Sequence, residues 1–135
     1  MILTVSGWRD WKDPEFVLAH FLPYVNDYQF TLYVRVGDAP GVDQVIRDWL
    51  VQHSVPWIRY KADWDAYGKG AGPIRNGEML RGEGLHDLHP NTITDRLLAF
   101  PQPGINWKTD KSGTVDCILQ AAGLGVHVDV PGYKI

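Results

Sequence analysis

The sequence has little cysteine, no excess of basic residues and no long apolar run, and each absence excludes a class of protein. Only Cys117 among the 135 residues is a cysteine, so neither an intramolecular disulfide nor a cysteine-rich zinc site can form. Thirteen basic and sixteen acidic residues give a formal charge of −3, which disfavours a protein that covers long stretches of nucleic-acid backbone. The apolar start, residues 1–6, is too short for a membrane span and lacks the basic residues of an export signal. We therefore expect a cytoplasmic protein without a membrane partner.

Patterns typical of metal sites and catalytic nucleophiles are also missing. None of the five histidines has metal-ligand spacing on a helix. His86 and His89 share a polar loop with Asp87, and we expect all three to be solvated. Cys117 lies in an apolar stretch with helical character, where a buried and inert thiol is expected. The sequence thus predicts no bound metal and no required cofactor.

The sequence does contain alternating signals for strands and helices. Apolar residues make up 44% of the chain, so one folded domain over residues 1–135 is expected. Apolar, β-rich runs predict strands at 1–6, 30–36, 55–60, 96–100 and 126–130. Helical spacing predicts helices from Asp13-Pro14 onward (loosening near Pro23), at 41–53, at 73–80 and at 114–122. The remaining segments predict an ordered loop at 63–72 and polar surface excursions at 81–94 and 101–112.

Strands that alternate with single helices predict an α/β fold with a parallel sheet covered on both faces. In such sheets ligands bind outside the carboxyl ends of the strands, near the point where the strand order reverses. The unusual segments of this sequence follow the predicted strands, at 7–10, 37–43, 63–76 and 101–114. We therefore expect these segments to meet at one edge of the sheet.

Residues 37–43, Gly-Asp-Ala-Pro-Gly-Val-Asp, join the second predicted strand to the second helix. The glycines allow a sharp turn and a close approach to a ligand, and the helix start offers N–H groups to an anion. The spacing is neither that of a P-loop nor that of a dinucleotide-binding loop. A plain tight turn, with Asp38 or Asp43 as a helix cap, is an equal alternative.

Residues 63–76 combine three glycines, two aromatics and two cations before a proline-started helix. Arg75 and Asn76 are expected in the first helical turn, where Arg75 can hold a phosphate through two parallel hydrogen bonds. Trp64 or Tyr67 can stack on a base. The alternative is a surface loop whose aromatics plug the end of the sheet.

Ser112-Gly113-Thr114 precedes the last predicted helix, and its hydroxyls and exposed N–H groups offer a second binding site for an anion. An ordinary helix cap, made by Ser112 or Thr114, competes with this interpretation. Asp116 follows in the first turn, where a carboxylate is favourable in any case. Three tryptophans in the predicted edge loops are candidates for stacking: Trp8, Trp64 and Trp107.

Together these motifs resemble one known group of proteins. In chain order they are Gly7-x-Arg9-Asp10, Gly37-Asp38-Ala39-x-Gly41-x-Asp43, Ala62-Asp63-Trp64, Tyr67-Gly68-Lys69-x-Ala71-Gly72-Pro73-x-Arg75-Asn76-x-x-Met79, Ala99-Phe100-Pro101 and Ser112-Gly113-Thr114-x-Asp116. This series resembles the YspA-like branch of the SLOG superfamily, which is related to the Lonely-guy phosphoribohydrolases and the DprA-type DNA-binding proteins.

The resemblance implies a Rossmann-like three-layer α/β/α fold with a mainly parallel five-stranded sheet. It also implies that the protein senses or sequesters a nucleotide or nucleotide-derived ligand, such as an ADP-ribose relative. The ligand-binding residues it implies are Gly7, Arg9, Asp10, Gly37, Asp38, Gly41, Asp43, Trp64, Tyr67, Lys69, Gly72, Arg75, Asn76, Ser112, Gly113 and Thr114. Relatives often form dimers, so a homodimer is one arrangement that the resemblance allows.

Two further functions are alternatives to ligand binding alone. As an enzyme, the protein would hydrolyse the N-glycosidic bond of a nucleotide with Arg75 and Asp116 as catalytic residues. Gly113-Thr114 matches the end of the Lonely-guy Pro-Gly-Gly-x-Gly-Thr motif, but the double glycine after Pro101 is replaced here. Single-stranded DNA binding is favoured by the aromatics and the DprA kinship and disfavoured by the acidic balance, so nucleic acid is not the expected partner.

Overall fold

A computed structural model of the chain describes residues 1–106 and 109–132. In this part of the chain five strands form one sheet, in which every pairing is parallel. The strands are β1 (Ile2–Gly7), β2 (Tyr33–Gly37), β3 (Trp57–Tyr60), β4 (Arg96–Phe100) and β5 (His127–Asp129). Their order across the sheet is β3-β2-β1-β4-β5. The α/β class and the predicted parallel sheet are therefore confirmed.

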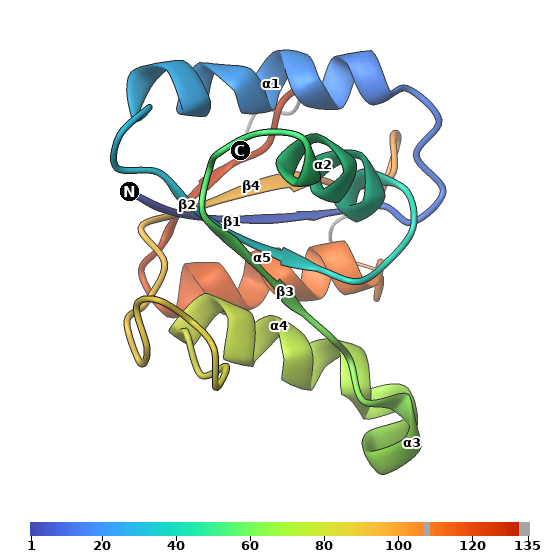
Figure 1. Ribbon diagram of the computed structural model, residues 1–135. Coiled ribbons are helices and arrows are strands. Elements are labelled where there is room, and N and C mark those ends of the chain that lie inside the picture. The colour runs from blue at the N-terminus through green and yellow to red at the C-terminus, as the bar shows by residue number, and fades with distance from the viewer. Residues whose placement is uncertain (107–108, 133–135) are drawn as a thin grey trace.

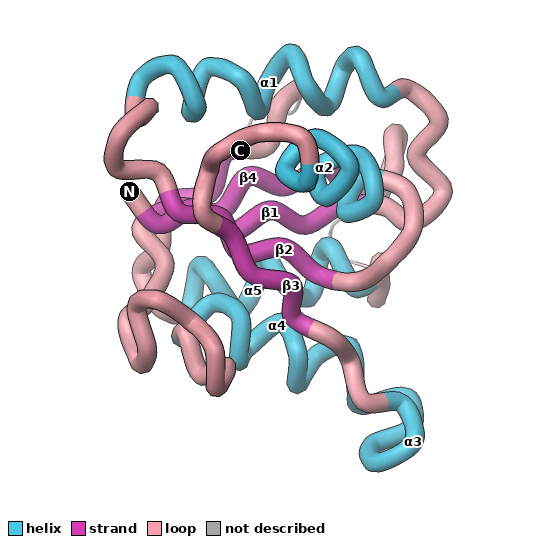
Figure 2. The backbone as a smooth tube through the Cα atoms, in the orientation of Figure 1, coloured by secondary structure: helices cyan, strands magenta, loops and turns pink. Residues whose placement is uncertain are grey.

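Four helices cover the two faces of this sheet. Figure 1 shows α1 (Pro14–Asp27) and α2 (Val42–Val51) above the sheet and α4 (Ala71–Arg81) and α5 (Gly113–Gly123) below it. Figure 2 shows the same three layers, helix, sheet and helix, in a view coloured by secondary structure. The architecture is a Rossmann-like three-layer α/β/α sandwich.

The core is divided by the sheet into two parts, because successive strand residues point to opposite faces. On β4, Leu98 and Phe100 pack with α1 and α2, whereas Leu97 and Ala99 pack with α4 and α5. Burial on both faces explains why the central strands are continuous apolar runs in the sequence. Cys117 faces the second part of the core and is fully buried, as expected.

The predicted start of α1 is confirmed, and its course differs from the prediction at one point. Asp13 caps α1 by accepting a hydrogen bond from the Phe16 N–H at 3.2 Å, and Pro14 is the first helical residue. The helix continues through Pro23 to Asp27 rather than loosening there. Proline costs the helix one backbone hydrogen bond. The buried side chains of Phe21 and Tyr24 on either side of it stabilise the helical turn by packing into the core.

Residues 63–72 are not the loop that the sequence predicted. They form a short helix, α3 (Trp64–Tyr67), a 3₁₀ turn, η1 (Gly68–Gly70), and the first turn of α4. Asp63 caps α3 by accepting from the Ala66 N–H at 3.0 Å. Since α4 begins at Ala71 rather than Pro73, Arg75 and Asn76 lie in its second turn and not in its first.

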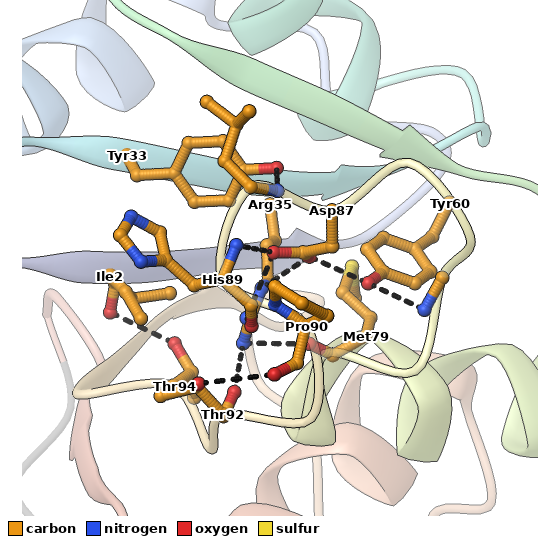
Figure 3. A network of polar contacts seen from close by, with 12 residues as sticks. Ile2, Tyr33, Arg35, Tyr60, Met79, Asp87, His89, Pro90, Thr92 and Thr94 are labelled. Atoms are coloured by element: carbon orange, nitrogen blue, oxygen red, sulfur yellow. Dashed lines mark hydrogen bonds and ion pairs between the residues drawn. The ribbon is translucent and has the colours of Figure 1, made fainter.

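Residues 82–95 lie at the amino ends of the strands, and most of them are exposed, as predicted for a surface excursion. Asp87 differs from its prediction: the sequence predicted a solvated side chain, but Asp87 is buried and anchors the segment to the core. Arg35 of β2 and Asp87 are buried and form an ion pair at 2.8 Å (Figure 3). Asp87 also accepts from the Tyr60 hydroxyl at 2.7 Å. Burial alone would raise the pKa of Asp87, but hydrogen bonds from Arg35, Tyr60 and the His89 N–H outweigh it and hold the pKa below its ordinary value.

The described residues contain no helix that is both long and apolar enough to cross a membrane.

Candidate functional site

The strand order reverses between β1 and β4, because the chain leads from β1 toward β2 but from β4 toward β5. At this point the Trp8 N–H donates to the carbonyl of Phe100 at 2.8 Å, just beyond the carboxyl ends of both strands. Crevices at such positions are the usual ligand sites of open parallel sheets. We call this rim, with the loops that follow the strands, the carboxyl edge.

The loop from Gly37 to Asp43 packs directly against the loop that follows β1. Gly41 has a φ of +74°, and a Cβ atom there would lie 2.4 Å from the carbonyl oxygen of Trp8. Glycine is therefore needed at this position both for its backbone conformation and for the close approach. Gly41 is the N-cap of α2, and no side chain caps this helix.

Asp43 is a buried acid rather than the helix cap that the sequence offered as an alternative. One carboxylate oxygen, Oδ2, accepts from the Ala39 N–H at 3.2 Å, whereas Oδ1 has no hydrogen-bond partner in the described part of the chain. Burial raises the pKa of Asp43 to about 7, against the opposing effects of the Arg75 charge, the Ala39 N–H and the Arg47 charge. Arg47 is itself held by the carbonyls of Gly37 and Ala39, at 2.7 and 2.9 Å.

Arg75 reaches this loop from α4. Its Nη1 donates to Oδ1 of Asp38 at 2.7 Å, and its Nε donates to Oδ1 of Asn76 at 3.1 Å. Within residues 1–106 and 109–132, Nη2 donates to no acceptor. A Cβ atom on Gly37 would lie 2.7 Å from Nη1, so the guanidinium passes over a position that only glycine leaves open. The arginine that the sequence singled out thus lies beside the loop with which it was predicted to act.

Asn76 connects Arg75 to the start of α5. Its Nδ2 donates to the Gly113 carbonyl and to Oδ2 of Asp116, both at 3.0 Å. Gln120 also donates to Oδ2 of Asp116, at 2.8 Å, and to the carbonyl of Pro73 at 3.0 Å. The second carboxylate oxygen of Asp116 accepts no hydrogen bond from the described residues. Two amides therefore fix the orientation of a half-buried carboxylate and leave one of its oxygens available.

The other predicted site residues have mixed surroundings. Ser112 caps α5 by accepting from the Val115 N–H at 3.3 Å, and Thr114 is buried. Gly7 packs against α2, Gly72 packs against Trp64, and Arg9 and Asp10 are exposed. Trp64, Tyr67 and Lys69 are exposed on α3 and η1, which project from the layers in Figure 2. Trp107 lies outside the described residues.

Two hollows open on the carboxyl edge. A polar one of about 220 Å³ lies beside Arg75, lined by Lys61, Asp63, Tyr67, Ala71, Ile74, Arg75 and Glu78. A larger one of about 590 Å³ lies at the other end of the edge, lined by Trp8, Trp11, Lys12, Asp13, Phe16, Pro103, Gly104, Pro131 and Gly132. We call the larger hollow the aromatic cleft.

The sequence interpretation missed most of the aromatic cleft. Trp11 lies edge-on to Trp8, with ring centroids 6.5 Å apart, and stacks on Phe16 at 5.6 Å. Phe16 belongs to the apolar stripe of a helix. Core residues show the same spacing, so the sequence did not indicate that Phe16 lines a cleft. Trp11 did carry a signal, because it lies three residues after Trp8 in a loop that follows the first strand.

One curated protein is similar to this chain over nearly its whole length. The Gene 61 protein of Mycobacterium phage D29 is 28% identical over 131 residues, which cover 93% of this chain and 92% of that protein. No protein-family model matches the chain. The name of the phage protein states no activity.

Proposed function

We propose that this protein binds a nucleotide or nucleotide-derived ligand across the carboxyl edge of its sheet. One observation carries the proposal: segments from residues 37–43, 71–76 and 112–116 converge at Arg75, which contacts Asp38 and Asn76, while Asn76 in turn contacts Gly113. An arginine with an uncommitted N–H pair, at the carboxyl edge of a parallel sheet beside the end of β2, is well suited to a phosphate. The resemblance to the YspA-like branch of the SLOG superfamily supports the same class of ligand.

The aromatic cleft suits the base of such a ligand. Its aromatic rings offer apolar faces on which a planar heterocycle can pack, and a cleft of this size is within the usual range for small-molecule sites. Arg75 belongs to α4, and the cleft residue Phe16 belongs to α1 on the other side of the sheet, so the ligand would extend over the carboxyl edge from the cleft to Arg75.

The test is isothermal titration of the protein with a panel of nucleoside monophosphates, nucleoside diphosphates and ADP-ribose. We expect Arg75→Ala to weaken binding by about 1.5–3 kcal/mol, because it removes a charged hydrogen-bond pair. Arg59→Ala is the control, since Arg59 is an exposed cation of β3 that lines neither hollow. No binding across the panel, or equal loss in both variants, would contradict the proposal.

A second candidate, N-glycosidic hydrolysis, is favoured by the geometry of Asp116. A carboxylate held by Asn76 and Gln120, with one oxygen left available, can stabilise a developing oxocarbenium charge or orient a water molecule. The experiment is chromatographic detection of base released from nucleoside monophosphates. Release that is lost in Asp116→Asn supports an enzyme, whereas tight binding without release supports a binding protein.

A further inference from the structure

The charges around Arg75 are mainly negative. Asp38 pairs with it directly at 2.7 Å, and Asp43 lies close by, since one Cβ atom on Gly37 would touch both Oδ2 of Asp43 and Nη1 of Arg75. Lys61 lines the polar hollow beside Arg75 but is exposed, as are Asp63 and Tyr67 beside it. Arg47 is a buried cation of this region, but its donors are engaged by the Gly37 and Ala39 carbonyls and by Gln44. The Asp38 carboxylate is therefore already bound to Arg75 when a ligand arrives.

Asp38 holds the position that a ligand oxyanion would take on Nη1. The pair is partly shielded from water, with 13% of the Arg75 side chain and 26% of the Asp38 side chain exposed. The backbone on either side of Asp38 is fixed, because Arg47 binds the carbonyls of Gly37 and Ala39. A ligand can rotate the Asp38 side chain away from Arg75, but it cannot remove the carboxylate from the neighbourhood.

From this we infer that Asp38 determines which phosphate groups the site accepts. The inference rests on the proposed function and names its substrate class: ligands whose phosphate carries one negative charge, as in a phosphodiester or a pyrophosphate bridge, in preference to ligands that end in a doubly charged phosphate. The physical reason is repulsion, which grows with each charge placed near the Asp38 carboxylate and is weakly screened in a partly buried site.

A matched pair of ligands isolates this effect. Adenosine 5′-monophosphate carries close to two phosphate charges at pH 8, because its second ionisation lies near pH 6. Its methyl phosphodiester has the same base and sugar and one charge. In titration calorimetry at pH 8 and low salt, we expect the wild-type protein to bind the methyl ester on the order of tenfold more tightly than the monophosphate.

The deciding variant is Asp38→Asn, which keeps the size of the side chain and removes its charge. We expect Asp38→Asn to bind the monophosphate on the order of tenfold more tightly than the wild type does, and to lose the preference for the methyl ester. Asp27→Asn is the control for net charge, because Asp27 is exposed at the far end of α1. We expect it to show the same ratio of affinities as the wild type. Circular dichroism and thermal unfolding verify that each variant is folded, and Asp38→Ala repeats the test should Asp38→Asn fail to fold.

The outcomes separate this inference from the proposed function. Equal ratios of affinities in Asp38→Asn and the wild type would overturn the role of Asp38 and leave the nucleotide site intact. Absence of binding by either ligand to any variant would overturn both. Binding of the monophosphate by Asp38→Asn but not by the wild type would support both the nucleotide site and the role of Asp38. The Asp38 carboxylate would then be the group that excludes the monophosphate from the wild-type site.

Discussion

Arg35 and Asp87 form a buried ion pair between residues that are fifty-two positions apart in the chain. The guanidinium donates to both carboxylate oxygens, at 2.8 and 3.2 Å, and its remaining donors reach the carbonyls of Thr92 and His89 at 2.8 and 3.0 Å. Burying two charges is costly unless they are paired and fully hydrogen-bonded. Here both conditions are met, so the pair attaches the 82–95 segment firmly to β2.

We expect Asp87→Asn to destabilise the protein by about 3–5 kcal/mol, because it leaves the Arg35 charge buried without its partner. The free energy of unfolding in urea measures this cost. Tyr60→Phe is the matched control, since it keeps both charges of the ion pair and removes one hydroxyl that donates to the same carboxylate and accepts from the Gly84 N–H. We expect it to cost less, about 1.5–3 kcal/mol. Equal costs in the two variants would mean that the ion pair does not hold the segment in place.

The pKa of Asp43 predicts an unusual dependence of stability on pH. An aspartate titrates near pH 4 in an unfolded chain, whereas burial raises the pKa of Asp43 to about 7 in the folded protein. Between these values the folded state binds a proton that the unfolded state lacks, so its stability falls as pH rises from 4 to 7 and stays reduced above pH 7. Over the whole range the loss is on the order of 4 kcal/mol.

Asp43→Asn tests this directly, because an amide does not ionise. We expect the difference in unfolding free energy between Asp43→Asn and the wild type to shift in favour of the variant by up to about 3 kcal/mol between pH 5 and pH 8.5. Denaturant titrations at both pH values give the measurement. Parallel pH curves for the two proteins would show that Asp43 stays ionised in the fold.

Cys117 offers a chemical probe of the part of the core that lies between α5 and the sheet. Burial raises the pKa of its thiol to about 12, so both access and ionisation oppose reaction at neutral pH. We expect a disulfide reagent to label the native protein only as fast as the protein opens, and in a single rapid phase after unfolding. Rapid labelling in native buffer would contradict the burial of α5 against the sheet.

The sequence was sufficient to predict the sheet, because strands buried on both faces leave continuous apolar runs that few other structures produce. It was insufficient for the segments at either end of α4. Asp63 and Trp64 were interpreted as parts of a loop because a single capped turn has no periodicity. Asp87 was expected to be solvated because its neighbours are polar, and nothing local indicates a partner on a distant strand.

The candidate site also has one part that the sequence predicted and one part that it did not. Arg75 and the Gly37–Asp43 loop were predicted to meet because parallel strands place their carboxyl ends at one edge, and the structure brings them together. The links from Asn76 through Asp116 to Gln120 depend on how α4 packs on α5, a relationship that spacing along either helix does not specify. Strand topology therefore predicts which segments meet, whereas the packing of α4 on α5 determines which side chains form hydrogen bonds.

Gly37→Ala tests whether this packing and the proposed site depend on the same atoms. The added methyl group would lie 2.6 Å from Oδ2 of Asp43 and 2.7 Å from Nη1 of Arg75, so both groups must shift. We expect a loss of stability of about 1–3 kcal/mol, as for overpacking elsewhere, together with weaker nucleotide binding in titration calorimetry.

Gly123→Ala is the control, because a Cβ atom at the end of α5 meets nothing within 4 Å. We expect that variant to match the wild type in binding and to be no less stable. Wild-type affinity in a folded Gly37→Ala protein would show that the ligand does not need Arg75 where the structure places it.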